Sequence, residues 1–409
     1  MSVLKTGALL AAASFIAFSS PLAASASPAL ANTSATPVEA VACGGEMEDW
    51  FNGLLSEARE AGVTDHGIGE LIRASLDDKV LARDRAQGVF NQTFVQFASR
   101  MVSDYRLKQG AANLKKYAEA FAKAEAEYGV PGPVIAAFWG LETDFGAVQG
   151  NFDTLNALLT LSYDCRRPQL FRPQLIALLQ LFDKGVVDAS TTGAWAGEIG
   201  QMQILPKDYL ERGVDGDGDG KVDLKNSAPD AIMTTARMMS ELGWRKGEPW
   251  LEEVKLTKDL PWEQAIRTNR LPHSQWKEWG VEAPNGPLGP DNGNASLLLP
   301  MGRTGPAFLS YPNYDIFLEW NQSFVYATTA AYFATRLAGA AKMADVDADP
   351  GLSPDQTKEL QNKLQARGYE MGKIDGILGI LTRDAARKEQ LRLGLPADAW
   401  PTVELLNRL

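Results

Sequence analysis

Apolar residues recur at three- and four-residue spacing along most of the chain between about residues 46 and 339. The clearest runs are Trp50, Phe51, Leu54 and Leu55, then Leu114, Tyr117, Ala118 and Phe121, then Ile176, Leu179 and Phe182. This spacing gathers apolar side chains on one face of an α-helix. Because strand-like alternation is scarce, we predict a mainly α fold.

The pattern changes near both ends of the chain. Residues 1–31 combine Lys5, an apolar stretch over residues 8–18 and small-residue cleavage sites, which predicts a signal peptide. Residues 32–44 are small and nearly uncharged, as in a disordered lead. An acidic stretch with a Pro-Gly pair, residues 341–352, predicts a linker between a large domain at 45–340 and a small module at 353–409.

Length and charge narrow the class of protein. The 409 residues exceed the ~100–200 of a typical domain. Without the predicted signal peptide, 39 basic side chains face 51 acidic ones, which argues against nucleic-acid binding. After the leader, no stretch approaches the ~18 apolar residues of a membrane helix, so we expect an exported, periplasmic protein without a transmembrane segment.

The chain has two cysteines, Cys43 and Cys165. In an oxidising compartment, two cysteines suggest one disulfide. Lipid attachment at Cys43 is the alternative, because residues 40–42 (AVA) precede it. It is disfavoured because Cys43 lies far beyond the apolar core of the leader and no leucine stands three residues before it.

One carboxylate stands inside an apolar run, FWGLETDFG at residues 138–146. Residues 134–141 are apolar all round, which predicts a buried helix. Pro131 and Pro133 fit its first turn and Gly146 its end, so Glu142 falls in the last turn.

Burial and the negative end of the helix dipole both favour the protonated form of Glu142, which would suit a general acid in glycosidic bond cleavage. On this feature alone, a structural Glu paired with an arginine is the better explanation. Glycosidases normally use a second carboxylate within ~5–10 Å. The nearest in sequence, Asp144, points to another side of the helix, so a lone acid implies an unusual mechanism.

Several separated motifs then make a specific resemblance: GVPGPVIAAFWGLETDFGAVQGNF, GAWAGEIGQMQILPKDYL, APDAI with LGWRKGEPW, and LLLPMGRTGPAFLSYPNYDIFLEWNQSFVYA. In this order they resemble lytic murein transglycosylases of the membrane-bound transglycosylase B family. The resemblance implies a lysozyme-like catalytic domain with Glu142 as the single acid/base. It implies cleavage of the MurNAc–GlcNAc β-1,4 bond of peptidoglycan without water, giving 1,6-anhydromuramoyl ends.

The resemblance also implies substrate-binding roles for Gln203, Asn321, Tyr326 and Arg167. Each has a plainer alternative: an amide satisfying local backbone for Gln203, a helix-core aromatic for Tyr326, and a surface cation for Arg167.

The chain departs from the family pattern at three positions. Ala194 replaces a frequent serine, Glu198 a small residue and Trp320 a tyrosine. These departures raise the question of what holds the proton on Glu142.

An acidic loop, DGDGDGKVD at residues 215–223, has oxygen ligands at calcium spacing: Asp215, Asp217, Asp219 and the carbonyl of Lys221. Asn226 stands where an EF-hand has its bidentate Glu, and Asp230 is the candidate replacement. The pattern predicts either structural calcium or a metal-free acidic turn. The two histidines, His66 and His273, are too far apart in sequence for a zinc motif, and we expect no organic cofactor.

The C-terminal module contains LQNKLQARGYEMGKIDGILGILT. This run resembles the small three-helix peptidoglycan-binding domain, which implies peptidoglycan glycan strands as the partner. Two rival functions stay open: a muramidase that hydrolyses the same bond, and a non-catalytic wall-binding protein.

Overall fold

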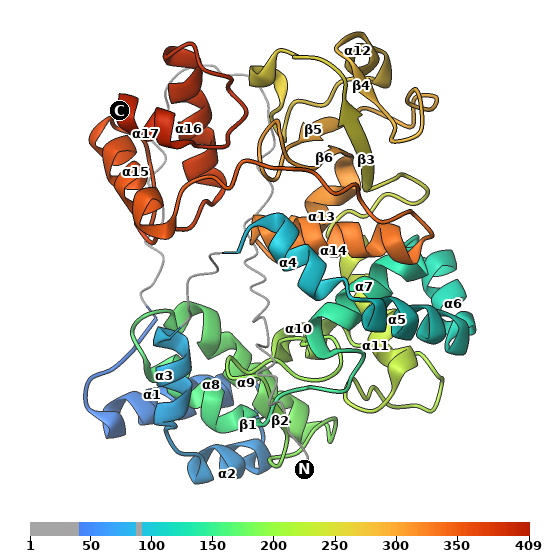
Figure 1. Ribbon diagram of the computed structural model, residues 1–409. Coiled ribbons are helices and arrows are strands. Elements are labelled where there is room, and N and C mark those ends of the chain that lie inside the picture. The colour runs from blue at the N-terminus through green and yellow to red at the C-terminus, as the bar shows by residue number, and fades with distance from the viewer. Residues whose placement is uncertain (1–40, 87–91) are drawn as a thin grey trace, which may run out of the picture.

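The structure, a computed structural model, describes residues 41–86 and 92–409. The predicted signal peptide and most of the predicted lead lie outside this part. The prediction of a mainly α fold is confirmed (Figure 1). The predicted linker, residues 341–352, contains neither helix nor strand.

One end of the molecule, at the bottom of Figure 1, is a group of helices. These are α1 (Met47–Glu60), α2 (Asp65–Arg73), α3 (Asp78–Arg85), α8 (Thr154–Tyr163) and α9 (Pro168–Asp183). The carboxylate of Asp183 accepts hydrogen bonds from the backbone N–H groups of Thr64 (2.7 Å) and Gly67 (2.8 Å). The end of α9 thereby satisfies otherwise unpaired N–H groups at the start of α2.

The centre of the molecule is a helical layer around α7. It comprises α4 (Phe94–Met101), α5 (Asp104–Lys116), α6 (Ala118–Tyr128), α7 (Gly132–Thr143), α10 (Pro206–Arg212), α11 (Ala228–Glu241), α13 (Pro312–Trp320) and α14 (Phe324–Leu337). The predicted continuous helix over residues 114–121 is instead two helices, because the backbone breaks at Tyr117. Helix α7 packs against α14 and α5 and is almost entirely buried.

A small sheet, which the sequence pattern did not predict, covers the upper side of this layer. Its strands are β3 (Leu251–Leu256), β4 (Val281–Glu282), β5 (Ser296–Leu298) and β6 (Ala307–Ser310), accompanied by η1 (Trp262–Gln264) and α12 (His273–Glu278). The order is β4-β3-β6-β5, with antiparallel pairs such as Leu297 with Leu309. Strands β5 and β6 are buried at every position, so they lack the alternation that marks a half-exposed strand.

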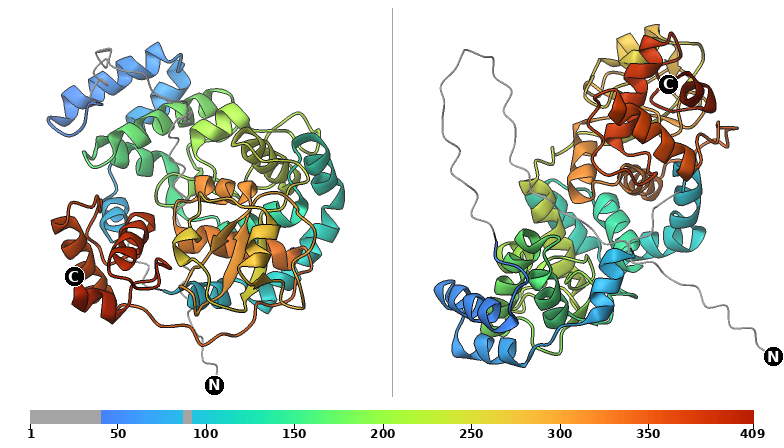
Figure 2. Two further views of the ribbon diagram at one scale, coloured as in Figure 1. Left: turned by 90° about the horizontal axis from the view of Figure 1, so that it is seen from above. Right: turned by 90° about the vertical axis from the view of Figure 1, so that its left-hand side faces the viewer.

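The C-terminal module consists of α15 (Pro354–Ala366), α16 (Ile380–Arg392) and α17 (Val403–Arg408) around a core of its own. It lies at the end of the molecule opposite α1–α3 (Figure 2). Arg383 of α16 attaches it to the large domain. The guanidinium donates to the carbonyl of Pro300 (2.7 Å) and lies over the ring of Phe324, at the start of α14.

Candidate active site

Glu142 is in the last turn of α7, as predicted, and is 4% exposed. Pro131 is the N-cap, and the apolar residues of the helix are buried on all sides. The residue that ends the helix in a left-handed conformation is Asp144 (φ 53°), not Gly146. Asp144 forms an ion pair with Arg106 (3.1 Å).

Two hydrogen-bond donors from distant parts of the chain converge on one oxygen of Glu142. The hydroxyl of Tyr326 donates to Oε1 at 2.5 Å, and the indole N–H of Trp320 donates to the same oxygen at 3.1 Å. Both side chains are buried. Burial and the charge of Glu142 raise the pKa of Tyr326 well above its usual value, so the phenol stays protonated and keeps donating. Trp320, a departure from the family pattern, is therefore a direct partner of the carboxylate.

A tight turn over residues 193–204 packs on the end of α7. The hydroxyl of Thr143, next to Glu142, donates to the carbonyl of Gln201 at 2.6 Å. Gln203 has a left-handed backbone (φ 52°), which is uncommon outside glycine and typical of functional sites. Its side-chain N–H donates to the carbonyls of Gly200 (2.9 Å) and Gln149 (3.2 Å). The amide nitrogen of Gln203 is thus held by local backbone.

The same turn carries a second buried carboxyl group, on Glu198, which is 2% exposed. Burial, together with the charge of Glu142, raises the pKa of Glu198 to about 7. Ala194 is buried nearby in the turn, and its backbone N–H donates to the carbonyl of Glu198 (3.0 Å). The sequence marked both positions as departures from a family pattern: Ala194 removes a hydrogen-bond partner, and Glu198, if near Glu142, is expected to raise its pKa as a like charge.

Asn321 and Arg167 lie at the edges of this region. Asn321 follows α13 directly, and its side-chain oxygen accepts the backbone N–H of Ser323 (2.9 Å) at the start of α14. Arg167, just before α9, forms an ion pair with the buried Asp84. Burial lowers the pKa of Arg167, and the charge of Asp84 opposes this effect. Their predicted contacts with substrate stay predictions.

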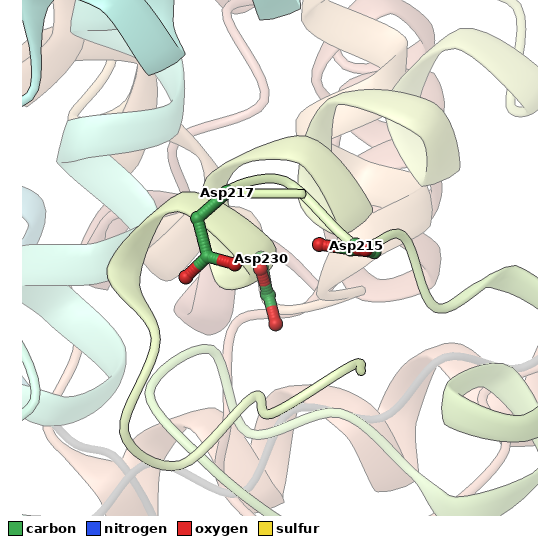
Figure 3. Close-up of side chains that lie close together, drawn as sticks. All are labelled: Asp215, Asp217 and Asp230. Atoms are coloured by element: carbon green, nitrogen blue, oxygen red, sulfur yellow. The ribbon is translucent and has the colours of Figure 1, made fainter. Parts of the chain in front are cut away.

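The acidic loop brings three of its predicted ligands together. Carboxylate oxygens of Asp215, Asp217 and Asp230 all lie within 4.8 Å of one another. Figure 3 shows Asp215 and Asp217 on either side of Asp230, which projects from the start of α11. Donation by the backbone N–H of Gly220 is the largest cause that lowers the pKa of Asp215. Asp215 therefore stays ionised and presents carboxylate oxygens, the ligand atoms that calcium prefers.

Asp219, a further predicted ligand, is not part of this three-aspartate group. The carboxylate of Asp219 accepts the backbone N–H of Lys221 at 2.9 Å, outside the three-aspartate group. Asp230 holds the loop closed as well, accepting from the backbone N–H groups of Gly216 (2.8 Å) and Asp223 (2.7 Å).

The predicted disulfide between Cys43 and Cys165 is confirmed. It joins the segment before α1 to the turn between α8 and α9, next to Arg167. Within the described residues, no helix is both long and apolar enough to cross a bilayer.

A buried carboxyl group that accepts hydrogen bonds from a phenol and an indole can support acid–base chemistry. Comparison with known proteins identifies which one it resembles. Residues 46–335 match the Transglycosylase SLT domain, and residues 353–409 match the Putative peptidoglycan binding domain. The chain therefore belongs to the SLT-domain transglycosylase family, with a C-terminal peptidoglycan-binding domain.

Individual relatives agree with this assignment. The chain is 28% identical over 239 residues to membrane-bound lytic murein transglycosylase B of Escherichia coli K12, an alignment that covers 58% of this chain and 65% of the relative. The crystal structure of SltB3 from Pseudomonas aeruginosa in complex with NAG-anhNAM-pentapeptide is 35% identical, with a TM-score of 0.80, covering 89% of this chain and 99% of SltB3.

A third related structure contains calcium. The Escherichia coli lytic transglycosylase Slt35 in complex with calcium superposes with a TM-score of 0.58 at 26% identity, covering 74% of this chain and 97% of Slt35. These structures confirm the predicted lysozyme-like fold of the large domain.

Proposed function

We propose that this protein is a lytic transglycosylase that cleaves the MurNAc–GlcNAc β-1,4 bond of peptidoglycan and leaves 1,6-anhydromuramoyl ends, with Glu142 as its catalytic residue. The observation that carries the proposal is the buried Glu142 with Tyr326 and Trp320 both donating to Oε1. The family membership and the peptide-bearing anhydro sugar bound by SltB3 support it.

The hydrogen bonds suggest how Glu142 works. Because Oε1 already accepts from a phenol and an indole, Oε2 is the oxygen that carries the transferable proton. Glu142 gives this proton to the glycosidic oxygen as the bond to the muramoyl C1 breaks. The ionised Glu142 then takes the proton of the sugar's own 6-hydroxyl as that oxygen bonds to C1. The proton count closes without water, and the two donors stabilise the carboxylate between the two transfers.

Gln203, Asn321 and Arg167 are the proposed substrate-binding residues. Gln203 and Asn321 border the turn and the helix end that surround Glu142, and each is at most 7% exposed. Arg167 is a cation beside this region that would meet a carboxylate of the lactyl or peptide group. We propose peptidoglycan glycan strands as the partner of the C-terminal module.

A cavity of about 430 Å³ is lined by residues of both the large domain and the C-terminal module. It supports a peptidoglycan-binding role for the module next to the large domain. Its lining includes Leu318 and Gln322, which flank Trp320 and Asn321, and several residues of the module between Met371 and Thr382. We keep 45–340 and 353–409 as the proposed domain boundaries. The module has a small core of its own, and its Trp400 packs into the core of the large domain.

Calcium is the proposed structural ion of the acidic loop, bound by Asp215, Asp217 and Asp230. Three carboxylates this close together fit a hard divalent cation, and Slt35 was crystallised in complex with calcium. Asp219 and Lys221 remain predicted ligands. No organic cofactor is proposed.

Export to the periplasm is the proposed location. A disulfide is expected in an oxidising compartment. Lipid attachment at Cys43 is disfavoured, because the sulfur that would carry the lipid is bonded to Cys165.

The test is digestion of purified sacculi by the full chain and by Glu142→Gln, with mass spectrometry of the products. We expect anhydro ends from the wild type and a loss of at least about a thousandfold in the rate of release with the amide, which cannot transfer a proton. Reducing ends in place of anhydro ends would establish a muramidase instead. Equal release by both proteins would establish a wall-binding protein without this chemistry.

A further inference from the structure

The C-terminal module contacts the helix that carries Tyr326, the phenol that donates to Glu142. Arg383, on α16 of the module, is 7% exposed, and its guanidinium lies 4.7 Å from the centroid of the Phe324 ring. Phe324 is the first residue of α14 and is itself buried. The contact between the two domains therefore falls two residues before Tyr326.

Arg383 is held from both domains. Its guanidinium lies 5.2 Å from the centroid of the Trp400 ring and donates to the carbonyl of Leu378 (3.3 Å), both in the module. It also donates to the carbonyl of Pro300 (2.7 Å), in the loop between β5 and β6. Burial lowers the pKa of Arg383 to about 10, so the group is still charged at neutral pH. A buried cation over an aromatic face interacts more strongly than an exposed one.

The contacts around Trp400 dock the module onto the same loop. The carboxylate of Asp398 accepts the backbone N–H of Arg303 (3.0 Å). The indole of Trp400 donates to the carbonyl of Asp349 (3.1 Å), in the linker. Gly302 permits this close approach, because a Cβ atom there would lie 2.5 Å from the Cβ of Trp400. The module is thus seated on the large domain by specific contacts, in addition to the covalent linker.

Phe324 and Tyr326 belong to the first turn of α14. The hydroxyl of Ser323 accepts the backbone N–H of Tyr326 (3.4 Å), and the backbone N–H of Ser323 donates to the side chain of Asn321 (2.9 Å). The N–H groups of a first turn have no acceptor within the helix, so its position depends on contacts of this kind. Any shift of the turn also moves the hydroxyl of Tyr326, which lies 2.5 Å from Oε1 of Glu142.

We propose that Arg383 is a positioning residue for the proposed reaction: by holding Phe324 it fixes the first turn of α14 and keeps the hydroxyl of Tyr326 on Glu142. Arg383 acts through Phe324 rather than on the substrate. The module then serves the chemical step as well as attachment to the wall. The two roles have different kinetic signatures, because a lost wall contact raises KM, whereas a misplaced Tyr326 lowers kcat.

The experiment measures kcat and KM of the full chain on short soluble glycan strands, with Arg383→Ala made in the wild type and in Tyr326→Phe. In the wild type we expect kcat to fall about tenfold with little change in KM, because a small misplacement of a catalytic group is costly. In Tyr326→Phe the hydroxyl to be positioned is absent, so the further loss should be less than about twofold. Phe324→Leu removes the same contact from the large domain and should give the same pattern. Arg392→Ala is the matched control on α16, because Arg392 is paired with Glu389 inside the module, and it should leave kcat unchanged.

Equal losses of kcat from Arg383→Ala in the two backgrounds, or a raised KM with kcat unchanged, would overturn the inference and leave Arg383 a docking residue. If Arg383→Ala disrupts the module, Phe324→Leu in the same two backgrounds decides in the same way. The inference rests on the proposed function, and the two fail differently. Activity in Glu142→Gln removes the proposed function, whereas an inactive Glu142→Gln together with equal losses in the two backgrounds removes only the role of Arg383.

Discussion

Two groups of carboxylates in this chain have opposite environments. Glu142 and Glu198 are buried, and the pKa of Glu198 is raised to about 7. Asp215 and Asp217 lie on an open loop beside the buried Asp230, and the pKa of Asp215 is lowered by donation from backbone N–H groups, that of Gly220 first. Chemically these side chains are nearly identical. Their surroundings differ: burial favours the neutral form of Glu198, and backbone N–H donors favour the ionised form of Asp215.

The comparison shows which interactions decide whether a carboxyl group is neutral or ionised. Around Glu198, desolvation outweighs every favourable interaction, so the neutral acid is competitive near neutral pH. Around Asp215, the backbone N–H groups of Gly218 (2.6 Å) and Gly220 (2.8 Å) stabilise the charged form. The neutral acid is therefore favoured where desolvation dominates, and the ionised form is favoured where backbone N–H groups donate to the carboxylate.

The largest expected effect concerns stability. The pKa of Glu198 is raised from 4.5 to about 7 by folding, so the native state binds more protons between these values and the free energy of unfolding falls as pH rises through them. Replacing Glu198 by Gln removes this penalty. We expect Glu198→Gln to be more stable than the wild type by up to about 3 kcal/mol at pH 8, with a much smaller difference at pH 4.5. Urea unfolding at both pH values measures it, and a gain independent of pH would contradict the burial argument.

The next effect concerns the donors to Glu142. Tyr326→Phe removes the hydroxyl that donates to Oε1 but keeps the ring. A hydrogen bond to a charged group contributes roughly 1.5–3 kcal/mol, so we expect kcat to fall about tenfold to a hundredfold with little change in KM. Steady-state kinetics on soluble glycan strands tests this.

The matched control for Tyr326→Phe is Tyr332→Phe, on the same helix. The hydroxyl of Tyr332 accepts the backbone N–H of Met343 rather than contacting Glu142. Equal losses in the two variants would mean that Tyr326 serves only the packing of α14.

The smallest effect concerns the acidic loop. At free calcium ten times the dissociation constant, binding to one site should add about 1.4 kcal/mol to the free energy of unfolding, seen as a rise of a few degrees in Tm. Asp230→Asn should abolish this rise, whereas Asp65→Asn, at an exposed site on α2, should retain it. Thermal melts with calcium or with chelator measure this rise in Tm. A wild-type Tm that neither additive changes would exclude a calcium site in the loop.

This calcium effect should not vary between pH 6 and 8. Because the pKa of Asp215 is lowered, its ionised form persists to more acidic pH than that of an ordinary aspartate. The contribution of this charge is complete above the usual range and is lost only as pH falls below it. The stability gain of Glu198→Gln should change between pH 6 and 8, and the calcium-dependent rise in Tm should not. This difference in pH dependence is the sharpest form of the comparison.

Much of the architecture could be predicted from local pattern. The apolar run of α7 predicted its burial, and the spacing of Ile176, Leu179 and Phe182 predicted α9. The strands β5 and β6 could not be predicted in this way, because both of their faces are buried and alternation disappears. The break at Tyr117 also escaped, because the apolar spacing continues across it.

What the sequence by itself determined is the chemistry available: a lone glutamate at the end of an apolar helix, an acidic loop at calcium spacing, and two cysteines. Periodicity and turn residues locate each of these features along the chain to within a few residues. Only the tertiary structure decided the partners of Glu142, because Trp320 and Tyr326 lie 178 and 184 residues away along the chain. The same holds for Glu198, whose proton affinity depends on burial and on the charge of Glu142, and neither exists until the turn over residues 193–204 packs against α7.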